Sequence, residues 1–178
     1  AGESGLENAN TTAIFRAGCE AIQQVEQDRN KEIKAVVHFA NPEKQNYMTY
    51  AKALADAGVE YDVFASSYYP YWHGTLDNLK NQLNAITEKY GKEVMVAETS
   101  WATGLEDSDG HANTVREGNN DAGMDYDFSI YGQAKELREV INAVAEMNKG
   151  IGVFYWEPAW IPVKVYDPEA EDAEQTLA

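Results

Sequence analysis

Cysteine and basic residues are scarce in this chain, and each scarcity excludes a class of structure or partner. Among 178 residues there is one cysteine, Cys19, so no disulfide can form within the chain. Lysine and arginine total 14 against 30 aspartates and glutamates, which gives a formal net charge of −16. A surface this acidic repels phosphate backbones and anionic membranes, so we expect no nucleic-acid or membrane partner. A neutral polymer or a cation is the easier ligand.

Long apolar runs are also missing. No segment reaches the roughly 18 consecutive apolar residues that a membrane-spanning helix needs. The first ten residues, AGESGLENAN, lack the basic-then-apolar pattern of a signal peptide. We therefore expect that a leader was removed or that the chain starts internally. With 44% apolar and 11% aromatic residues, the composition is that of an ordinary globular domain with a sizeable core.

Helical and strand-like patterns alternate along the chain. Apolar residues recur at three- and four-residue spacings in segments 12–28, 47–57, 75–90 and 128–148, which predicts four helices. Short apolar runs at 33–40, 61–67, 93–97 and 151–156 predict four strands. We expect Asn10 or Thr11 to cap the first helix and Cys19 to pack inside it. Such alternation is typical of a parallel sheet covered by helices.

Two architectures fit this alternation. One is a small open, doubly wound sheet, and the other is the carboxyl-terminal half of a (β/α)8 barrel, which typically has about 250 residues when complete. A doubly wound nucleotide-binding sheet would carry a glycine-rich turn after its first strand. The sequence HFANPEKQ at 38–45 has no glycine there. The half-barrel is therefore the favoured prediction.

Every predicted strand ends in polar or aromatic residues. In a (β/α)8 barrel the carboxyl ends of the strands form the active-site face. We therefore expect a site built from the residues at these ends, which are His38, Asn41, Tyr68, Tyr69, Glu98, Trp156 and Glu157.

Glu98 ends the apolar run EVMVA and is the strongest candidate for chemistry. A carboxylate at the tip of a buried strand must be solvated by a cleft or hydrogen-bonded by its neighbours. Retaining glycosidases use two such carboxylates about 5 Å apart, one as nucleophile and one as acid/base. The alternative is that Glu98 caps the following loop or pairs with a cation.

Aromatic residues favour a sugar-binding site. Trp and Tyr offer flat apolar faces with a polar edge, which suits the C–H faces and hydroxyls of sugar rings. The alternative is core packing, which is weaker for Trp72 and Trp160 because both lie in loops near prolines. The candidates are Tyr68, Tyr69, Trp72, Trp156 and Trp160.

The predicted loop 99–126 carries a potential ligand at every second residue. These residues are Asp107, Asp109, His111 and Asn113, with Gly110 allowing a tight turn. That spacing lets a loop wrap a hard cation such as calcium, for which His111 would use its backbone carbonyl. The alternative is a solvated acidic turn.

Four long blocks together resemble glycoside hydrolase family 53, the endo-β-1,4-galactanases. The blocks are VFASSYYPYWHGTL, VMVAETSW, EDSDGHANT and GIGVFYWEPAWIPV, and HFANPE fits as well. The resemblance spans about residues 33–163. It implies a (β/α)8 barrel of which this chain holds approximately strands five to eight with the preceding helix. It also implies retaining hydrolysis of β-1,4-galactan, Glu98 as nucleophile, and a structural calcium ion bound by Asp107, Asp109, His111 and Asn113.

The family pattern is incomplete at both ends of the sequence. The acid/base glutamate of the family lies in a GNE-type motif, which is absent here, and Glu3 is not a substitute for it. Near the other end only YDPE matches, so Asp167 is a weak further calcium candidate. We expect residues 1–163 to form the half-barrel and residues 164–178 to form a loosely ordered acidic tail.

The sequence thus predicts part of a secreted endo-β-1,4-galactanase that acts on galactan, a pectin side chain. Its acid/base would lie outside this chain, and the full domain would be monomeric. Two alternatives stay open, namely another retaining glycosidase such as a mannanase and a non-catalytic sugar-binding remnant.

Overall fold

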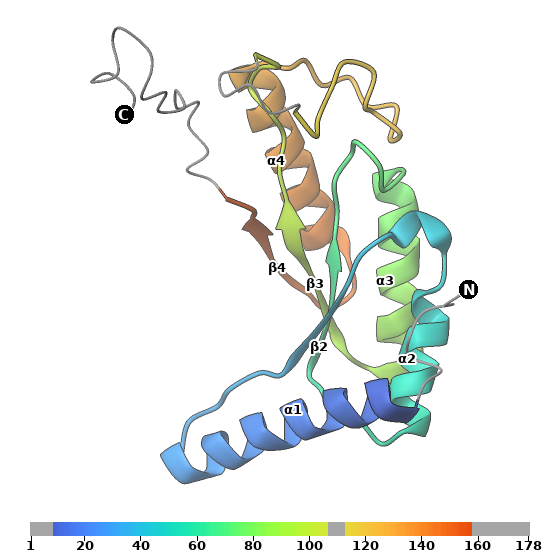
Figure 1. Cartoon of the computed structure of the whole chain (residues 1–178), viewed down its shortest axis with the longest axis vertical. Coiled ribbons are helices and arrows are strands. Elements are labelled where there is room, and N and C mark those ends of the chain that lie inside the picture. The colour runs from blue at the N-terminus through green and yellow to red at the C-terminus, as the bar shows by residue number, and fades with distance from the viewer. Residues whose placement is uncertain (1–8, 107–112, 158–178) are drawn as a thin grey trace, which may run out of the picture.

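A computed structural model describes residues 9–106 and 113–157, which form one parallel sheet with helices alternating along the chain (Figure 1). The sheet has the order β1-β2-β3-β4, with β1 (Val36–Phe39), β2 (Val63–Ser67), β3 (Glu93–Thr99) and β4 (Gly150–Tyr155). The helices are α1 (Ala9–Arg29), the 3-10 helix η2 (Pro42–Lys44), α2 (Tyr47–Asp56), α3 (Leu76–Tyr90) and α4 (Ile130–Glu146). The predicted alternation of helix and strand is confirmed.

Two of the helices begin at residues that cap their first turn. Thr75 precedes α3 and Ser129 precedes α4, and each side chain accepts a hydrogen bond from the backbone N–H three residues later. The cap predicted for the first helix is wrong, because Asn10 and Thr11 lie within α1.

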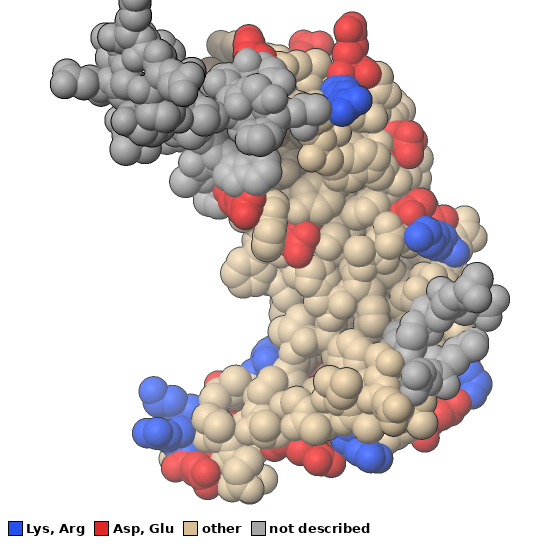
Figure 2. Space-filling view, in the orientation of Figure 1, with Lys and Arg blue, Asp and Glu red and all other residues tan. Residues whose placement is uncertain are grey.

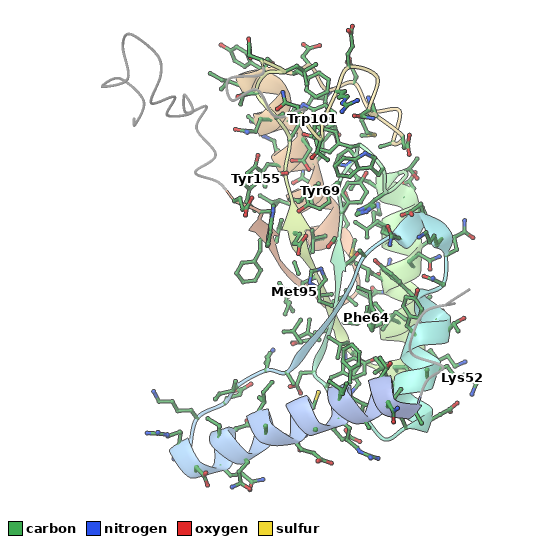
Figure 3. The ribbon with its side chains drawn as sticks, in the orientation of Figure 1. Lys52, Phe64, Tyr69, Met95, Trp101 and Tyr155 are labelled. Atoms are coloured by element: carbon green, nitrogen blue, oxygen red, sulfur yellow. The ribbon has the colours of Figure 1, made fainter. Side chains whose placement is uncertain are left out.

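The main core lies between the sheet and the helices α2, α3 and α4, which cover one face of it (Figure 1). Phe64 of β2 lies on this side (Figure 3). Alternate residues of each strand reach the core, because successive side chains of a strand point to opposite faces. Cys19 of α1 is 6% exposed and joins the core, as predicted. The fully buried members from the helices include Tyr47, Leu54, Leu79, Leu83 and Val140.

The other face of the sheet carries a smaller apolar cluster of Val63, Ala65 and Met95. The outer strands leave apolar side chains accessible on the same face, because Val36 and Phe154 are 45% and 65% exposed. The charged side chains visible in Figure 2 lie mainly at the bottom over α1, along the right-hand edge and at the top of the molecule, and the surface in the middle of this view is largely uncharged.

Candidate active site

A β-bulge sets the direction in which Glu98 points. β2 and β3 pair Ser66 with Val96 and then Ser67 with Glu98, so β3 contains one extra residue, Ala97. Ala97 packs against the apolar cluster on the face away from the helices. Strict alternation would turn the next side chain toward the helices. The extra residue instead keeps Glu98 on the face of Ser67, and the following Thr99 faces α4.

Two hydroxyl groups hold one oxygen of the Glu98 carboxylate. Ser67 Oγ donates to Oε2 at 3.2 Å, and Tyr69 OH donates to the same oxygen at 3.0 Å. Within the described part of the chain, Oε1 receives no hydrogen bond. These two bonds therefore fix the direction of one oxygen of the carboxylate.

Tyr69 is kept protonated and in place by its surroundings. Burial, together with the hydrogen bond to Glu98, raises the pKa of Tyr69 above its ordinary value of 10.0. Its backbone N–H donates to Nδ1 of His73 at 3.0 Å. Burial also lowers the pKa of His73, which favours the neutral ring that this bond requires. His73 is thus a supporting residue that the sequence reasoning missed.

His38 reaches the carboxylate indirectly. Its Nε2 atom lies 2.8 Å from Ser67 Oγ. Because Ser67 gives its one hydroxyl hydrogen to Glu98, Nε2 must be the donor in this contact. The structure thus places His38 beside Ser67, and its substrate-binding role stays a prediction. Asn41 lies between β1 and η2 in a left-handed backbone conformation, with a φ of 63°. Its side chain makes no capping hydrogen bond to η2.

Tyr68 is not part of the site, so its predicted substrate-binding role is wrong. Its side chain is 0% exposed, lies in the main core, and donates a hydrogen bond to the carbonyl of Gly74 at 3.0 Å. The cause is alternation along the chain, because Phe64, Ser66 and Tyr68 all face the helices. Of the two neighbouring tyrosines, Tyr69 is the one that contacts Glu98.

Two of the predicted tryptophans have accessible side chains near this edge of the sheet. Trp72 is partly exposed, and its ring lies 5.8 Å from the Tyr69 ring. Trp156 follows β4 and is 46% exposed, and its backbone N–H donates to the carbonyl of Thr99 at 2.9 Å. The third candidate, Trp160, lies outside the described residues.

A second aromatic core supports the loops above the sheet. Trp101 is stacked on Tyr71 with ring centroids 4.5 Å apart and on Phe128 at 5.0 Å. Figure 3 shows Trp101 beyond Tyr69, at the carboxyl-terminal side of the sheet. Trp101 Nε1 also donates to the carbonyl of Asp127 at 2.9 Å. The loop predicted to be polar is therefore anchored by buried aromatic rings.

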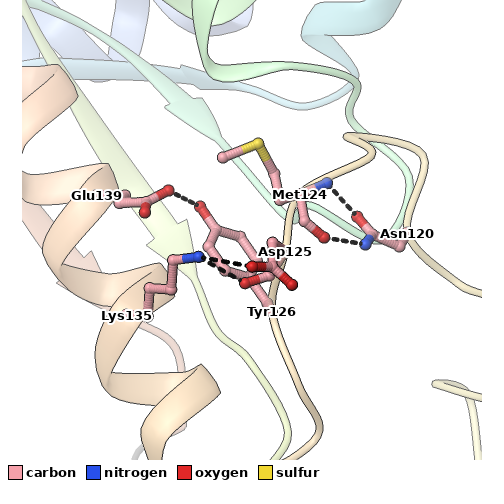
Figure 4. A network of polar contacts seen from close by, with 6 residues as sticks. All are labelled: Asn120, Met124, Asp125, Tyr126, Lys135 and Glu139. Carbon is pink, nitrogen blue, oxygen red and sulfur yellow. Dashed lines mark hydrogen bonds and ion pairs between the residues drawn. The ribbon is translucent and has the colours of Figure 1, made fainter.

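Polar contacts hold the end of this loop against α4 (Figure 4). Tyr126 OH donates to Glu139 Oε2 at 2.6 Å, and Lys135 Nζ donates to the carbonyl of Asp125 at 2.7 Å. Asn120 exchanges two hydrogen bonds with the backbone of Met124. The segment that carries Tyr126 into the aromatic core is thus tied at two points.

Of the predicted calcium ligands, the structure describes Asn113 alone, and Asp107, Asp109 and His111 lie outside the described residues. Asn113 Nδ2 donates to the carbonyls of Leu105 and Glu106, both at 3.3 Å. These bonds bring together the two flanks of segment 107–112 and leave the amide oxygen of Asn113 as an acceptor. The described residues contain no group of three or more His, Cys, Asp or Glu that could hold a metal ion. The calcium set stays a prediction.

Comparison with known protein sequences gives one consistent result. The model of glycosyl hydrolase family 53 matches residues 3–177. An endo-β-1,4-galactanase of Bacillus subtilis is 49% identical over 152 residues, which cover 84% of this chain and 34% of that protein. An arabinogalactan endo-β-1,4-galactanase of Humicola insolens is 35% identical over 141 residues, which cover 74% of this chain and 40% of that protein. The chain thus spans 34% to 40% of the length of these two relatives.

Solved structures give the same result. The GH53 catalytic domain of Ignisphaera aggregans superposes with a TM-score of 0.77 at 36% identity, covering 89% of this chain and 43% of that one. A fungal β-1,4-galactanase superposes with a TM-score of 0.66 at 28% identity, covering 85% of this chain and 45% of that one.

Proposed function

This chain belongs to glycosyl hydrolase family 53, and from that membership and the setting of Glu98 we propose that it forms part of a retaining endo-β-1,4-galactanase. Its four parallel strands correspond to part of the (β/α)8 barrel of the family's catalytic domains, so the half-barrel architecture is confirmed. The open doubly wound sheet is excluded.

In the proposed reaction Glu98 is the nucleophile. Its Oε1 forms a bond to the anomeric carbon of a galactosyl unit while the bond from that carbon to the leaving oxygen breaks. A second carboxylic acid, which we expect outside this chain, gives its proton to the leaving oxygen. Water then attacks the galactosyl-enzyme, loses a proton to that second carboxylate, and releases Glu98. Ser67 and Tyr69 keep Oε2 in place throughout.

We further propose that a neutral polysaccharide lies along this edge of the sheet. Trp72 is partly exposed and Trp156 is exposed there, and a net charge of −16 disfavours an anionic polymer. His38 and Asn41 at the end of β1, and Trp160 in the residues after β4, complete the proposed binding set.

Two other parts of the sequence prediction also stand as proposals. Asp107, Asp109, His111 and Asn113 would hold a structural calcium ion, which would fix the loop and take no part in the chemistry. An extracellular location is proposed because a galactan polymer is too large to enter a cell. None of the described helices is long and apolar enough to span a membrane.

The single observation that carries the proposal is the pair of hydroxyl donors on one oxygen of Glu98. The test is Glu98→Gln in the full-length protein that contains this chain, with release of reducing ends from galactan as the readout. The amide is nearly isosteric but cannot attack the anomeric carbon, so turnover should be lost while folding and galactan binding persist.

Glu93→Gln is the matched control, because Glu93 lies at the opposite end of the same strand and pairs with Lys34. That variant should remain active. Turnover by Glu98→Gln close to that of the parent would rule out the nucleophile assignment. Faster hydrolysis of mannan than of galactan would favour the mannanase alternative, and tight galactan binding without hydrolysis by the parent would favour the sugar-binding alternative.

A further inference from the structure

A carboxylate is buried in the apolar face of α4. Glu136 is 0% exposed and lies among the buried residues Gly132, Val140 and Ala143 of that helix. Its Oε1 atom accepts a hydrogen bond from Thr99 Oγ1 at 2.6 Å. Its Oε2 atom is buried and has no hydrogen-bond partner in the described part of the chain. Burying a carboxyl group with one unpaired oxygen costs free energy, so we expect Glu136 to have a specific role.

The partner of Glu136 lies between two parts of the proposed active site. Thr99 follows Glu98 directly and is itself 0% exposed. Its carbonyl accepts the backbone N–H of Trp156, the residue that follows β4. One side-chain contact from α4 therefore fixes the residue that joins Glu98 to Trp156.

Resting on the proposed function, we propose that Glu136 is a positioning residue, which as an uncharged acid holds Thr99 and thereby the strand ends that carry Glu98 and Trp156. It does not touch the substrate. Its effect on the reaction passes through the backbone of Thr99.

The surroundings of Glu136 favour its uncharged form. A charged carboxylate with one unpaired, buried oxygen costs far more than a neutral acid in the same place. Burial raises the pKa of Glu136 to about 7, the hydrogen bond from Thr99 opposes this shift, and the charge of Glu139 on the same helix adds to it. The other titratable groups facing it are hydroxyls from the β2–α3 loop, the loop before α4, and β4, namely Tyr68, Tyr71, Tyr126 and Tyr155.

The first test measures kcat and KM on galactan with the full-length protein, well below its unfolding temperature. Glu136→Met removes the acceptor for Thr99 and should lower kcat by roughly ten- to a hundredfold with little change in KM, because small displacements of reacting groups have such effects. Glu136→Gln retains an acceptor oxygen for Thr99, so its kcat should stay close to that of the parent. Glu146→Gln is the control, since Glu146 ends the same helix and pairs with Lys80, and it should keep the parental kcat.

A double variant keeps this test independent of folding defects. Thr99→Val combined with Glu136→Met replaces both partners by apolar groups, which avoids leaving one of them unpaired. Its kcat should fall no further than that of either single variant, because all of them lose the same contact. A parental kcat in Glu136→Met or in the double variant, with Glu98→Gln inactive, would overturn the positioning role and leave the proposed function intact.

The second test needs no activity. Because the pKa of Glu136 in the folded protein lies above its ordinary value of 4.5, the native state retains a proton that the unfolded chain has lost. The resulting stabilisation is complete below about pH 4.5 and is lost as the pH rises to about 7. The melting temperature of Glu136→Gln should therefore gain on that of the parent between pH 5 and pH 8. A constant difference across this range would overturn the uncharged state, whatever the enzyme's activity.

Discussion

At the scale of single residues, the two tyrosines that follow β2 have different roles, one in the core and one in the proposed active site. Tyr68 and Tyr69 are adjacent and each donates one hydrogen bond, yet Tyr68 bonds the carbonyl of Gly74 in the core while Tyr69 bonds Glu98. Removing the hydroxyl from each in turn therefore tests the site with two chemically identical changes.

Tyr69→Phe should lower kcat by about ten- to a hundredfold, since a hydrogen bond to a charged group contributes about 1.5–3 kcal/mol. Tyr68→Phe should leave kcat unchanged and lower the free energy of unfolding by about 1 kcal/mol. Galactan hydrolysis and urea unfolding of both variants check this pair. An equal loss of kcat in the two variants would show that Tyr69 acts through the fold and not through its contact with Glu98.

The two tyrosines also show what the sequence can predict at this scale. Alternation from Phe64 through Ser66 places Tyr68 on the helix face, so its burial could have been read from the pattern. The same reasoning fails for Glu98, because the bulge at Ala97 breaks the alternation. The position of Glu98 at the end of a strand was predictable. The direction of its side chain depended on pairing with β2, which no local pattern encodes.

At the scale of elements, the amino-terminal turn of α4 packs closely against the segment that precedes it. A Cβ atom on Gly132 would lie 1.8 Å from the backbone oxygen of Asp127. That oxygen accepts the hydrogen bond from Trp101 Nε1. The glycine therefore lets the helix approach the segment that anchors the aromatic core.

Gly132→Ala should destabilise the protein by about 1–3 kcal/mol, although alanine is the better helix former, because the added methyl group must displace backbone. Gly18→Ala is the control, because Gly18 lies in α1 and, its own helix backbone aside, no atom of the described residues lies within 4 Å of the added Cβ. That change should stabilise the protein by up to about 1 kcal/mol. Chemical unfolding of both variants gives the signs, and a gain in both would contradict the close packing at Gly132.

Element boundaries were predicted well where a cap or an apolar stripe marks them, and poorly elsewhere. Residues 132, 136, 140 and 143 lie on one buried stripe of α4, and helical periodicity alone did not indicate that a carboxylate at position 136 would be buried there. The prediction for β3 ended at residue 97, two residues before the observed end at Thr99. Polar residues at 98 and 99 suggested a loop, and pairing with β2 and β4 overrode that preference.

At the scale of the whole molecule, the long loop before α4 should depend on calcium. Calcium that binds the folded form alone would raise stability by roughly 2.7 kcal/mol at a hundredfold excess over its dissociation constant. EDTA should therefore lower the melting temperature of the full-length protein, and restored calcium should reverse the change. Asp109→Ala should give the same lower value without a chelator. Coincident melting curves with and without EDTA would identify the 107–113 spacing as an acidic turn.

Contacts between distant segments were beyond the sequence at this scale. The aromatic core joins Tyr71 of the β2–α3 loop with Trp101 and Phe128, which lie near the two ends of the β3–α4 loop. No local sequence pattern distinguishes a sugar platform from a core residue at these positions. The choice between the two depends on which loops meet above the sheet, and that is a property of the barrel and not of any one segment.

The stacked position of Trp101 also gives the molecule an internal optical probe. Trp101 is 1% exposed between two aromatic rings, whereas Trp156 is 46% exposed. Emission from Trp101 should lie at shorter wavelength than emission from Trp156. Dissolved iodide should quench the emission of Trp156 and leave that of Trp101 unchanged. Opening of the loops would expose Trp101 to water and shift its emission toward the red. Fluorescence can therefore follow the loops that frame Glu98 separately from the strand that carries it.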